Sequence, residues 1–204
     1  MGMKAPPSRI LDDLRRARVL VIHPRDDDGA VLIGQLRRLG CEVNASWPLP
    51  ATLPEGTDTV FISVEDTATD QAVQVFEGTN PAIIAVVTYE SPTSLRAIYD
   101  LNAHGVMSKP LRPLGILTQF TLARYRHSYE ARMTAKVRKL EDTLKGRRLV
   151  DRAIRLLIDE QGLDEDAAYR LLRDQATSER ITMAAIAEEL IAAHETMSRL
   201  GLKR

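Results

Sequence analysis

The sequence predicts an α/β fold, a doubly wound five-stranded parallel sheet, followed by a long coiled-coil helix and a small three-helix bundle. As far as residue 113, short apolar runs of strand type alternate with helix-like segments, as in doubly wound sheets. From residue 114 onward there is neither a strand-like run nor a proline, and charged residues become dense. We therefore expect a sheet domain at 1–113, a linker and coiled-coil helix at 114–146, and a helical domain at 147–204.

Composition narrows the class of protein further. The 204 residues are 44% hydrophobic, which is enough for a buried core, and 28 basic residues balance 28 acidic ones. With a net charge of zero, the chain has no overall electrostatic field that attracts nucleic acid or membranes, so binding to either needs a local charged patch. One cysteine and no signal-like or membrane-spanning run predict a cytoplasmic chain without disulfides. With 4% aromatic residues, an RNA-binding sheet that stacks bases is not expected.

Five segments have the pattern of strands. The first is a continuous β-branched run, typical of a buried parallel strand, whereas the second alternates like a half-buried one. The segments are Arg18–Ile22, Cys41–Ser46, Thr59–Val64, Ala82–Thr88 and Gly105–Ser108.

Helix-like segments separate these strands. Gly29–Leu39 has apolar residues at helical spacing and ends at Gly40, a typical helix terminator. Further helices are expected near Thr69–Phe76, at Ser94–Asn102 and from Pro113 onward.

A stripe of apolar residues marks the linker helix. Its members are spaced by four, four, three and four residues, which keeps them on one face and predicts a dimerising coiled coil. They are Tyr129, Met133, Val137, Leu140 and Leu144. The pattern alone leaves a second interpretation open, in which this helix packs back onto its own domain.

Three helices are expected beyond Gly146, at about Arg147–Gln161, Asp164–Ala176 and Thr182–His194. Gly162 ends the first and Asp164 caps the second. Their apolar faces can share one small core. These faces are Val150, Ile154, Leu157 and Ile158, then Ala168, Leu171 and Leu172, then Ile186, Leu190 and Ile191.

The sheet domain has the order of a receiver-like, flavodoxin-like fold, but not the chemistry of a phosphoaccepting one. Phosphoryl transfer there needs carboxylates after the first strand to hold Mg²⁺ and an aspartate after the third as nucleophile. The first strand ends at His23-Pro24, and Ser63 stands at the third-strand position. Thr88 and Lys109 remain, so Ser63, Thr88 and Lys109 form a degenerate phosphoacceptor site without catalysis, metal or cofactor. Residues 26–28, three aspartates, are interpreted as a helix-capping loop rather than a metal site.

The C-terminal segment resembles the ANTAR family of transcription antiterminators. Positions 153, 156, 157, 162, 164, 168, 169, 172, 173, 176, 186 and 187 carry residues at that family's spacings, and one departure is Ile154, where a lysine is common. The N-terminal segment resembles the pseudo-receiver of amidase-operon regulators of the AmiR type through Gly40-Cys41, Trp47-Pro48, residues 89–92, residues 104–106 and residues 109–111. The resemblance implies binding to hairpins of a leader mRNA, which prevents transcription termination. It also implies a homodimer, and control by sequestration by an AmiC-like ligand-sensing repressor in place of phosphorylation.

Arginines in the last domain are the expected RNA contacts, because guanidinium groups bind phosphates and stack on loop bases. They lie at i, i+4 and i+7 on the first helix and at i and i+3 on the second, beside a tyrosine. The set is Arg148, Arg152, Arg155, Tyr169, Arg170 and Arg173. A salt-bridged surface is the alternative for the arginines, since ten basic residues here accompany eleven acidic ones, and a core position is the alternative for Tyr169.

The basic excess lies on the linker helix, with seven basic and three acidic residues, where it could steer RNA, meet an acidic partner or only confer solubility. These basic residues are Arg124, Arg126, Arg132, Lys136, Arg138, Lys139 and Lys145.

The sequence also bears on two other classes of function. A DNA-binding response regulator is the alternative, because three helices behind a receiver can form a helix-turn-helix, yet the last helix carries acids and alanines in place of base-reading groups. An enzyme is not expected. The four histidines, at 23, 104, 127 and 194, have no ligand spacing or nearby nucleophile, and His104 is expected in a turn or at the surface.

Overall fold

The computed structural model describes residues 7–64 and 68–201, with side chains from residue 11. The chain forms two compact units, Met1–Ala131 and Arg132–Arg204.

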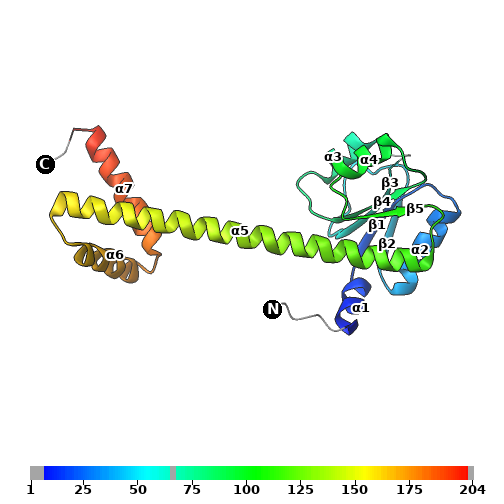
Figure 1. The fold of residues 1–204 in the computed structure, drawn as a ribbon, viewed down its shortest axis with the longest axis horizontal. Coiled ribbons are helices and arrows are strands. Elements are labelled where there is room, and N and C mark those ends of the chain that lie inside the picture. The colour runs from blue at the N-terminus through cyan, green and yellow to red at the C-terminus, as the bar shows by residue number, and fades with distance from the viewer. Residues whose placement is uncertain (1–6, 65–67, 202–204) are drawn as a thin grey trace. The chain divides into compact units, whose positions relative to one another are not determined.

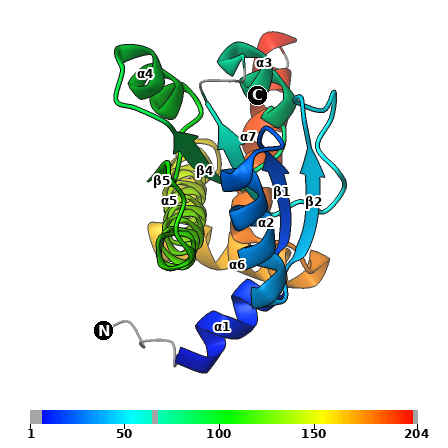
Figure 2. The ribbon, with the colours of Figure 1, turned by 90° about the vertical axis from the view of Figure 1, so that its right-hand side faces the viewer.

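The first unit is built on a five-stranded parallel sheet, which confirms the predicted fold class. Its strands follow the order β2-β1-β3-β4-β5, so the chain reverses its direction of winding at β1 (Figures 1 and 2). The strands are β1 (Arg18–Ile22), β2 (Glu42–Ser46), β3 (Thr59–Ser63), β4 (Ala82–Val87) and β5 (Gly105–Ser108). The central strands β1, β3 and β4 are almost entirely buried, as continuous apolar runs require.

Helices cover both faces of this sheet. On one face, Leu14, Leu36 and Phe120 come from three different helices and pack into one core. On the other, Phe76 and Ala97 come from the remaining two. The first face carries α1 (Pro7–Arg15), α2 (Asp27–Leu39) and the start of α5, and the second carries α3 (Thr69–Phe76) and α4 (Pro92–Asp100). Helix α1 is not among the predicted elements.

One helix, α5 (Pro113–Gln161), belongs to both units. The expected boundary between residues 146 and 147 falls inside it. Gly146 does not break the helix and lies close to Ala184, since a Cβ at this position would be 3.3 Å from the Ala184 Cβ, which is tighter than ordinary van der Waals contact.

The second unit is a three-helix bundle made by the end of α5, α6 (Glu165–Glu179) and α7 (Met183–Arg199). The Asp164 side chain caps α6 and Thr182 caps α7. Both helices run further than expected, and α6 ends where Arg180 adopts a left-handed φ of 59°. The core is largely the predicted one, but Leu171 is 45% exposed, so its assignment to the core is wrong. Residues 202–204 lie outside the described part of the chain.

Candidate functional site

The sheet brings the three residues of the degenerate phosphoacceptor site to one edge. Ser63 ends β3, Thr88 follows β4 and Lys109 follows β5, and these three strands are neighbours. Ser63 is buried, whereas Thr88 is exposed. This is the edge at which parallel α/β sheets place their ligand sites.

Asp26 lies at this edge, and its carboxylate stabilises the fold. One carboxylate oxygen accepts a hydrogen bond from the Gly29 backbone at 2.7 Å and so caps α2, as predicted. The other lies 3.5 Å from the Lys109 Nζ. Burial raises the pKa of Asp26, but the Gly29 hydrogen bond and the positive charge of Lys109 outweigh this, and the pKa lies below the ordinary 3.8.

Other polar groups around Asp26 also support local structure, although among the described residues the buried Nε2 of His23 has no hydrogen-bond partner. Asp28 accepts a hydrogen bond from the Leu111 backbone at 2.6 Å, which ties α2 to the segment after β5. His23 is buried, and its Nδ1 donates to the Pro24 carbonyl at 2.9 Å. A Cβ at Gly29 would lie 2.6 Å from that carbonyl oxygen, so only glycine fits. Within residues 7–64 and 68–201, no group of three histidine, cysteine or acidic side chains is arranged to hold a metal ion.

His104 lies in the bend before β5, as expected of a turn residue, but it is buried, so the expected surface position is wrong. Its Nδ1 accepts a hydrogen bond from the Ile83 backbone at 3.1 Å, and its Nε2 lies 3.5 Å from a Glu130 carboxylate oxygen. The ring meets His127 edge to face, with 5.0 Å between centroids. Burial lowers the pKa of His104, and the nearby Glu130 only partly opposes this.

Two of the seven basic linker residues are tied to the first unit. Arg124 donates to both carboxylate oxygens of Asp13 at 2.8 and 3.0 Å and to Asp58 at 2.8 Å. Arg126 donates to the His104 carbonyl at 3.1 Å. Because these guanidinium groups bind groups of their own unit, the interpretation that the basic residues only confer solubility is wrong for Arg124 and Arg126.

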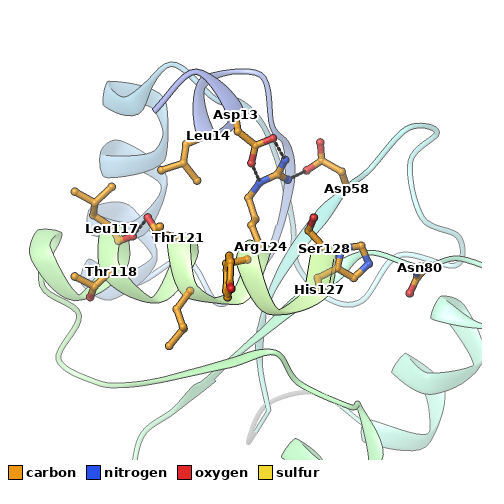
Figure 3. Close-up of a pocket in the computed structure, with 12 residues that line it drawn as sticks. Asp13, Leu14, Asp58, Asn80, Leu117, Thr118, Thr121, Arg124, His127 and Ser128 are labelled. Atoms are coloured by element: carbon orange, nitrogen blue, oxygen red, sulfur yellow. Dashed lines mark hydrogen bonds and ion pairs between the residues drawn. The ribbon is translucent and has the colours of Figure 1, made fainter. Parts of the chain in front are cut away.

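A cavity of about 880 Å³ lies along this part of α5 (Figure 3). Leu14 of α1 and Leu117, Leu122 and Tyr125 of α5 give it apolar walls. Arg124 reaches across it to Asp13 and Asp58, as the dashed lines in Figure 3 show. Sequence reasoning missed this cavity because its α1 wall was not predicted.

The predicted dimerisation residues are exposed. Tyr129, Met133, Val137, Leu140 and Leu144 each expose between 39% and 57% of their surface. The alternative, in which this stripe is buried against its own domain, is therefore wrong.

The six predicted RNA-binding residues also lie at the surface. Arg148, Arg152 and Arg155 share the solvent face of α5, opposite the bundle core. Tyr169 is 45% exposed, so the alternative that places it in the core is wrong. Arg170 and Arg173 lie beside it on α6 and are exposed as well.

Two of these arginines form ion pairs within the second unit. Arg152 donates to Glu195 of α7 at 2.6 Å, and Arg173 contacts the adjacent Asp174 at 3.0 Å. Exposed pairs of this kind contribute only about 0–1 kcal/mol, so a phosphate can displace them.

The fold defines a protein with a receiver-like domain followed by a helical C-terminal domain. The AmiR N-terminal family matches residues 17–124, and the ANTAR domain family matches residues 138–191. The chain is 31% identical over 185 residues to the aliphatic amidase regulator of Pseudomonas aeruginosa, across 89% of this chain and 94% of that protein. The chain belongs to the AmiR and ANTAR family of transcription antitermination regulators.

A solved structure shares the fold. The response regulator StyR superposes with a TM-score of 0.51 at 16% identity, over 87% of this chain and 99% of that one. A CheY-like receiver domain from Methanospirillum hungatei JF-1 gives 0.46 at 20% identity, over 56% and 98%. In the described part of the chain, no helix has the length and apolar character needed to cross a membrane.

Proposed function

We propose that this chain is an RNA-binding positive regulator that prevents transcription termination in a leader mRNA. It acts as a homodimer that binds hairpins of the leader, and an AmiC-like ligand-sensing repressor controls it by sequestration. The observation that carries the proposal is the exposed arginine face of the unit that the ANTAR family matches.

The chemistry of this face suits hairpin RNA. Arg148, Arg152 and Arg155 follow one side of α5 over two helical turns, which matches a run of backbone phosphates rather than a single anion. Tyr169, Arg170 and Arg173 add a ring and two planar cations that can stack on unpaired loop bases.

The committed groups of the receiver-like unit support control by sequestration. Asp26 caps α2 and contacts Lys109, and Asp28 holds the Leu111 backbone, so neither carboxylate is positioned for Mg²⁺. Ser63 offers no carboxylate to form an acyl phosphate. An input other than phosphorylation is then required, and a ligand-dependent partner that binds one state of the regulator supplies it.

Competition between two nucleic acids tests the RNA assignment. Full-length protein is titrated with the hairpin leader transcript of its own operon, with the matching duplex DNA as competitor, over a series of salt concentrations. We expect selective binding to the paired hairpins and a loss of affinity with rising salt. A preference for the duplex would instead support a DNA-binding response regulator.

An arginine pair tests the assignment of the face. Arg152→Ala with Arg173→Ala is expected to weaken leader binding by at least about tenfold and to reduce the salt slope by about two. The matched control is Arg37→Ala with Arg38→Ala, two exposed arginines on α2 of the other unit. Equal affinities of the two double variants, with folding and dimerisation intact, would contradict the assignment.

Mass spectrometry after incubation with a small-molecule phosphodonor and Mg²⁺ tests the mode of control. We expect no phosphorylation. A phosphoryl group on Ser63 or Asp26 would contradict control by sequestration alone.

A further inference from the structure

Large apolar side chains are exposed on α4 of the first unit. Leu95 and Tyr99 expose 62% and 82% of their surface. They are one helical turn apart, so they share the outer face of α4, opposite the buried Ser94 and Ala97. Tyr89, in the segment that precedes α4, exposes 64%. Exposed apolar groups that share one face in this way mark an interaction site.

A polar cavity of about 600 Å³ adjoins this outer face. Tyr89 forms part of its wall, and its charged lining groups are Asp70 of α3 with Arg96 and Asp100 of α4. Residues three apart on a helix are neighbours, so Arg96 lies between the cavity and Tyr99. The exposed apolar groups and the cavity therefore form one continuous surface, which we call the α4 surface.

The α4 surface carries an excess of negative charge. The Arg96 Nε donates to both carboxylate oxygens of Asp100, at 3.0 and 2.8 Å, so these two charges neutralise each other. Asp70 has no ion-pair partner among the residues that the structure describes. Residues 68–80 and 88–102, which contain α3 and α4, hold one arginine and four acidic residues, a net charge of −3 in a chain that is neutral overall. A positive charge is therefore favoured beside Asp70.

This combination of charge and apolar exposure limits what can bind there. A nucleic acid is repelled by acidic groups, because its own backbone is negative. A second copy of the chain that docked through the same face would bring the acidic groups of both copies together. A protein that presents a basic side chain among apolar ones matches both parts of the surface, and tyrosine is enriched at the centres of such interfaces.

We propose that the α4 surface is the docking site of the ligand-sensing repressor, which places a lysine or arginine beside Asp70 and apolar groups against Leu95 and Tyr99. This inference rests on the sequestration in the proposed function and adds the surface and the chemistry of the contact. None of these residues belongs to the arginine face of the second unit, so repressor docking and RNA contact use different side chains.

Biolayer interferometry tests the apolar part of the contact. The full-length chain is titrated with the ligand-sensing protein encoded in the same operon, without added ligand. Leu95→Ser and Tyr99→Ala are each expected to raise the dissociation constant at least about tenfold, because a few central apolar anchors carry most of the binding energy of an interface. Leu114→Ser, an exposed leucine of α5, is the matched control and is expected to leave the constant unchanged. Far-UV circular dichroism shows that each variant is folded.

An isosteric change tests the charged part. Asp70→Asn is expected to weaken repressor binding about tenfold at low salt and less at high salt, since salt screens an exposed pair. Glu55→Gln is the control, because it removes the same charge from an exposed position between β2 and β3. Equal effects of the two changes would overturn the assignment of a basic side chain to Asp70.

Binding to the leader transcript separates docking from RNA contact. Without the repressor, Tyr99→Ala is expected to bind the leader hairpins as tightly as the unmodified chain does. With the repressor present, the unmodified chain is expected to lose leader binding, whereas Tyr99→Ala keeps it.

The outcomes also separate this inference from the proposed function. If the repressor binds the unmodified chain, Leu95→Ser and Tyr99→Ala equally, sequestration stands and the α4 surface is overturned as its site. If the repressor does not bind the unmodified chain, sequestration itself fails, and this inference fails with it. If Tyr99→Ala weakens a homodimer in sedimentation equilibrium, the surface belongs to self-association and the inference is overturned.

Discussion

Arginines on the two parts of α5 behave differently, although they belong to one helix. In the first unit, Arg124 and Arg126 bind carboxylates and a carbonyl of their own domain. In the second unit, Arg148 and Arg155 are exposed to solvent. The difference depends on what faces the helix, because Asp13 of α1 and Asp58, the residue before β3, accept hydrogen bonds from Arg124, whereas Arg148 and Arg155 face solvent in the described part of the chain. A basic residue is thus available to a ligand only where its own fold leaves it uncovered.

The largest expected effect comes from removing the committed cation. Arg124→Met leaves the carboxylates of Asp13 and Asp58 beside an apolar side chain. We expect a loss of about 2 kcal/mol in the free energy of unfolding of the first unit, below the cost for a fully buried pair because both carboxylates are partly exposed. Urea unfolding followed by circular dichroism measures it.

Arg138→Met on the same helix is the control, since Arg138 is exposed. Its effect is expected to stay within about 0.5 kcal/mol. Equal destabilisation by both substitutions would show that replacing any arginine of α5 lowers stability. The contrast between bound and exposed arginines on this helix would then be lost.

This contrast also marks where sequence reasoning succeeds. The strands were predicted because β1, β3 and β4 are buried on both faces and so appear as unbroken apolar runs. Caps such as Asp164 are likewise local signals. Arg124 and His104 were misplaced because their partners, Asp13 and Ile83, lie far away in the sequence. No local pattern reports such a contact.

For the arginine face and the apolar stripe of α5, the sequence indicates which residues share a face but not what contacts that face. Helical spacing was enough to put Arg148, Arg152 and Arg155 on one face. It could not reveal that Glu195 binds Arg152, because that pair joins two helices. Leu171 shows the opposite failure, since its apolar character suggested a core position that the packing of α6 does not provide.

Asp26 provides the next largest effect. Asp26→Ala removes the cap of α2 and is expected to cost about 1 kcal/mol at neutral pH. Since the pKa of Asp26 is lowered in the folded chain, this contribution is present above pH 3.8 and is lost as the pH falls through the folded-state pKa. The measurement is urea unfolding at neutral and at acid pH.

Asp27→Ala tests whether the cap is specific. Asp27 lies in the first turn of the same helix, where a carboxylate contributes only a few tenths of a kcal/mol through the helix dipole. If Asp27→Ala costs as much as Asp26→Ala, the stabilisation comes from negative charge near α2 rather than from the bond to Gly29.

His104 should make the first unit sensitive to mild acid. Its pKa is lowered by burial, so the unfolded chain binds a proton more readily than the folded one. Stability is then expected to fall as the pH drops below about 6.5 toward the folded-state pKa. Glu130, His127 and Arg126 are the titratable and charged groups that act on it.

Unfolding free energies of the full-length chain between pH 7 and pH 5 measure this slope. His104→Asn keeps an acceptor for the Ile83 backbone and is expected to flatten the slope, whereas His194→Asn in the other unit is expected to leave it unchanged. A slope that persists in His104→Asn would assign the proton uptake to another group.

The smallest expected effect tests whether the exposed arginines are fully available. Glu195 binds Arg152 at 2.6 Å, so RNA must displace it. Glu195→Gln is expected to tighten binding to the leader hairpins about threefold, because an exposed ion pair is worth less than about 1 kcal/mol. Glu189→Gln removes the same charge from an exposed position of α7 and is expected to change affinity less. Weaker binding by Glu195→Gln would mean that Glu195 positions Arg152 for RNA rather than competing with it. An acidic residue of the second unit would then hold an arginine in place, as Asp13 and Asp58 hold Arg124 in the first unit.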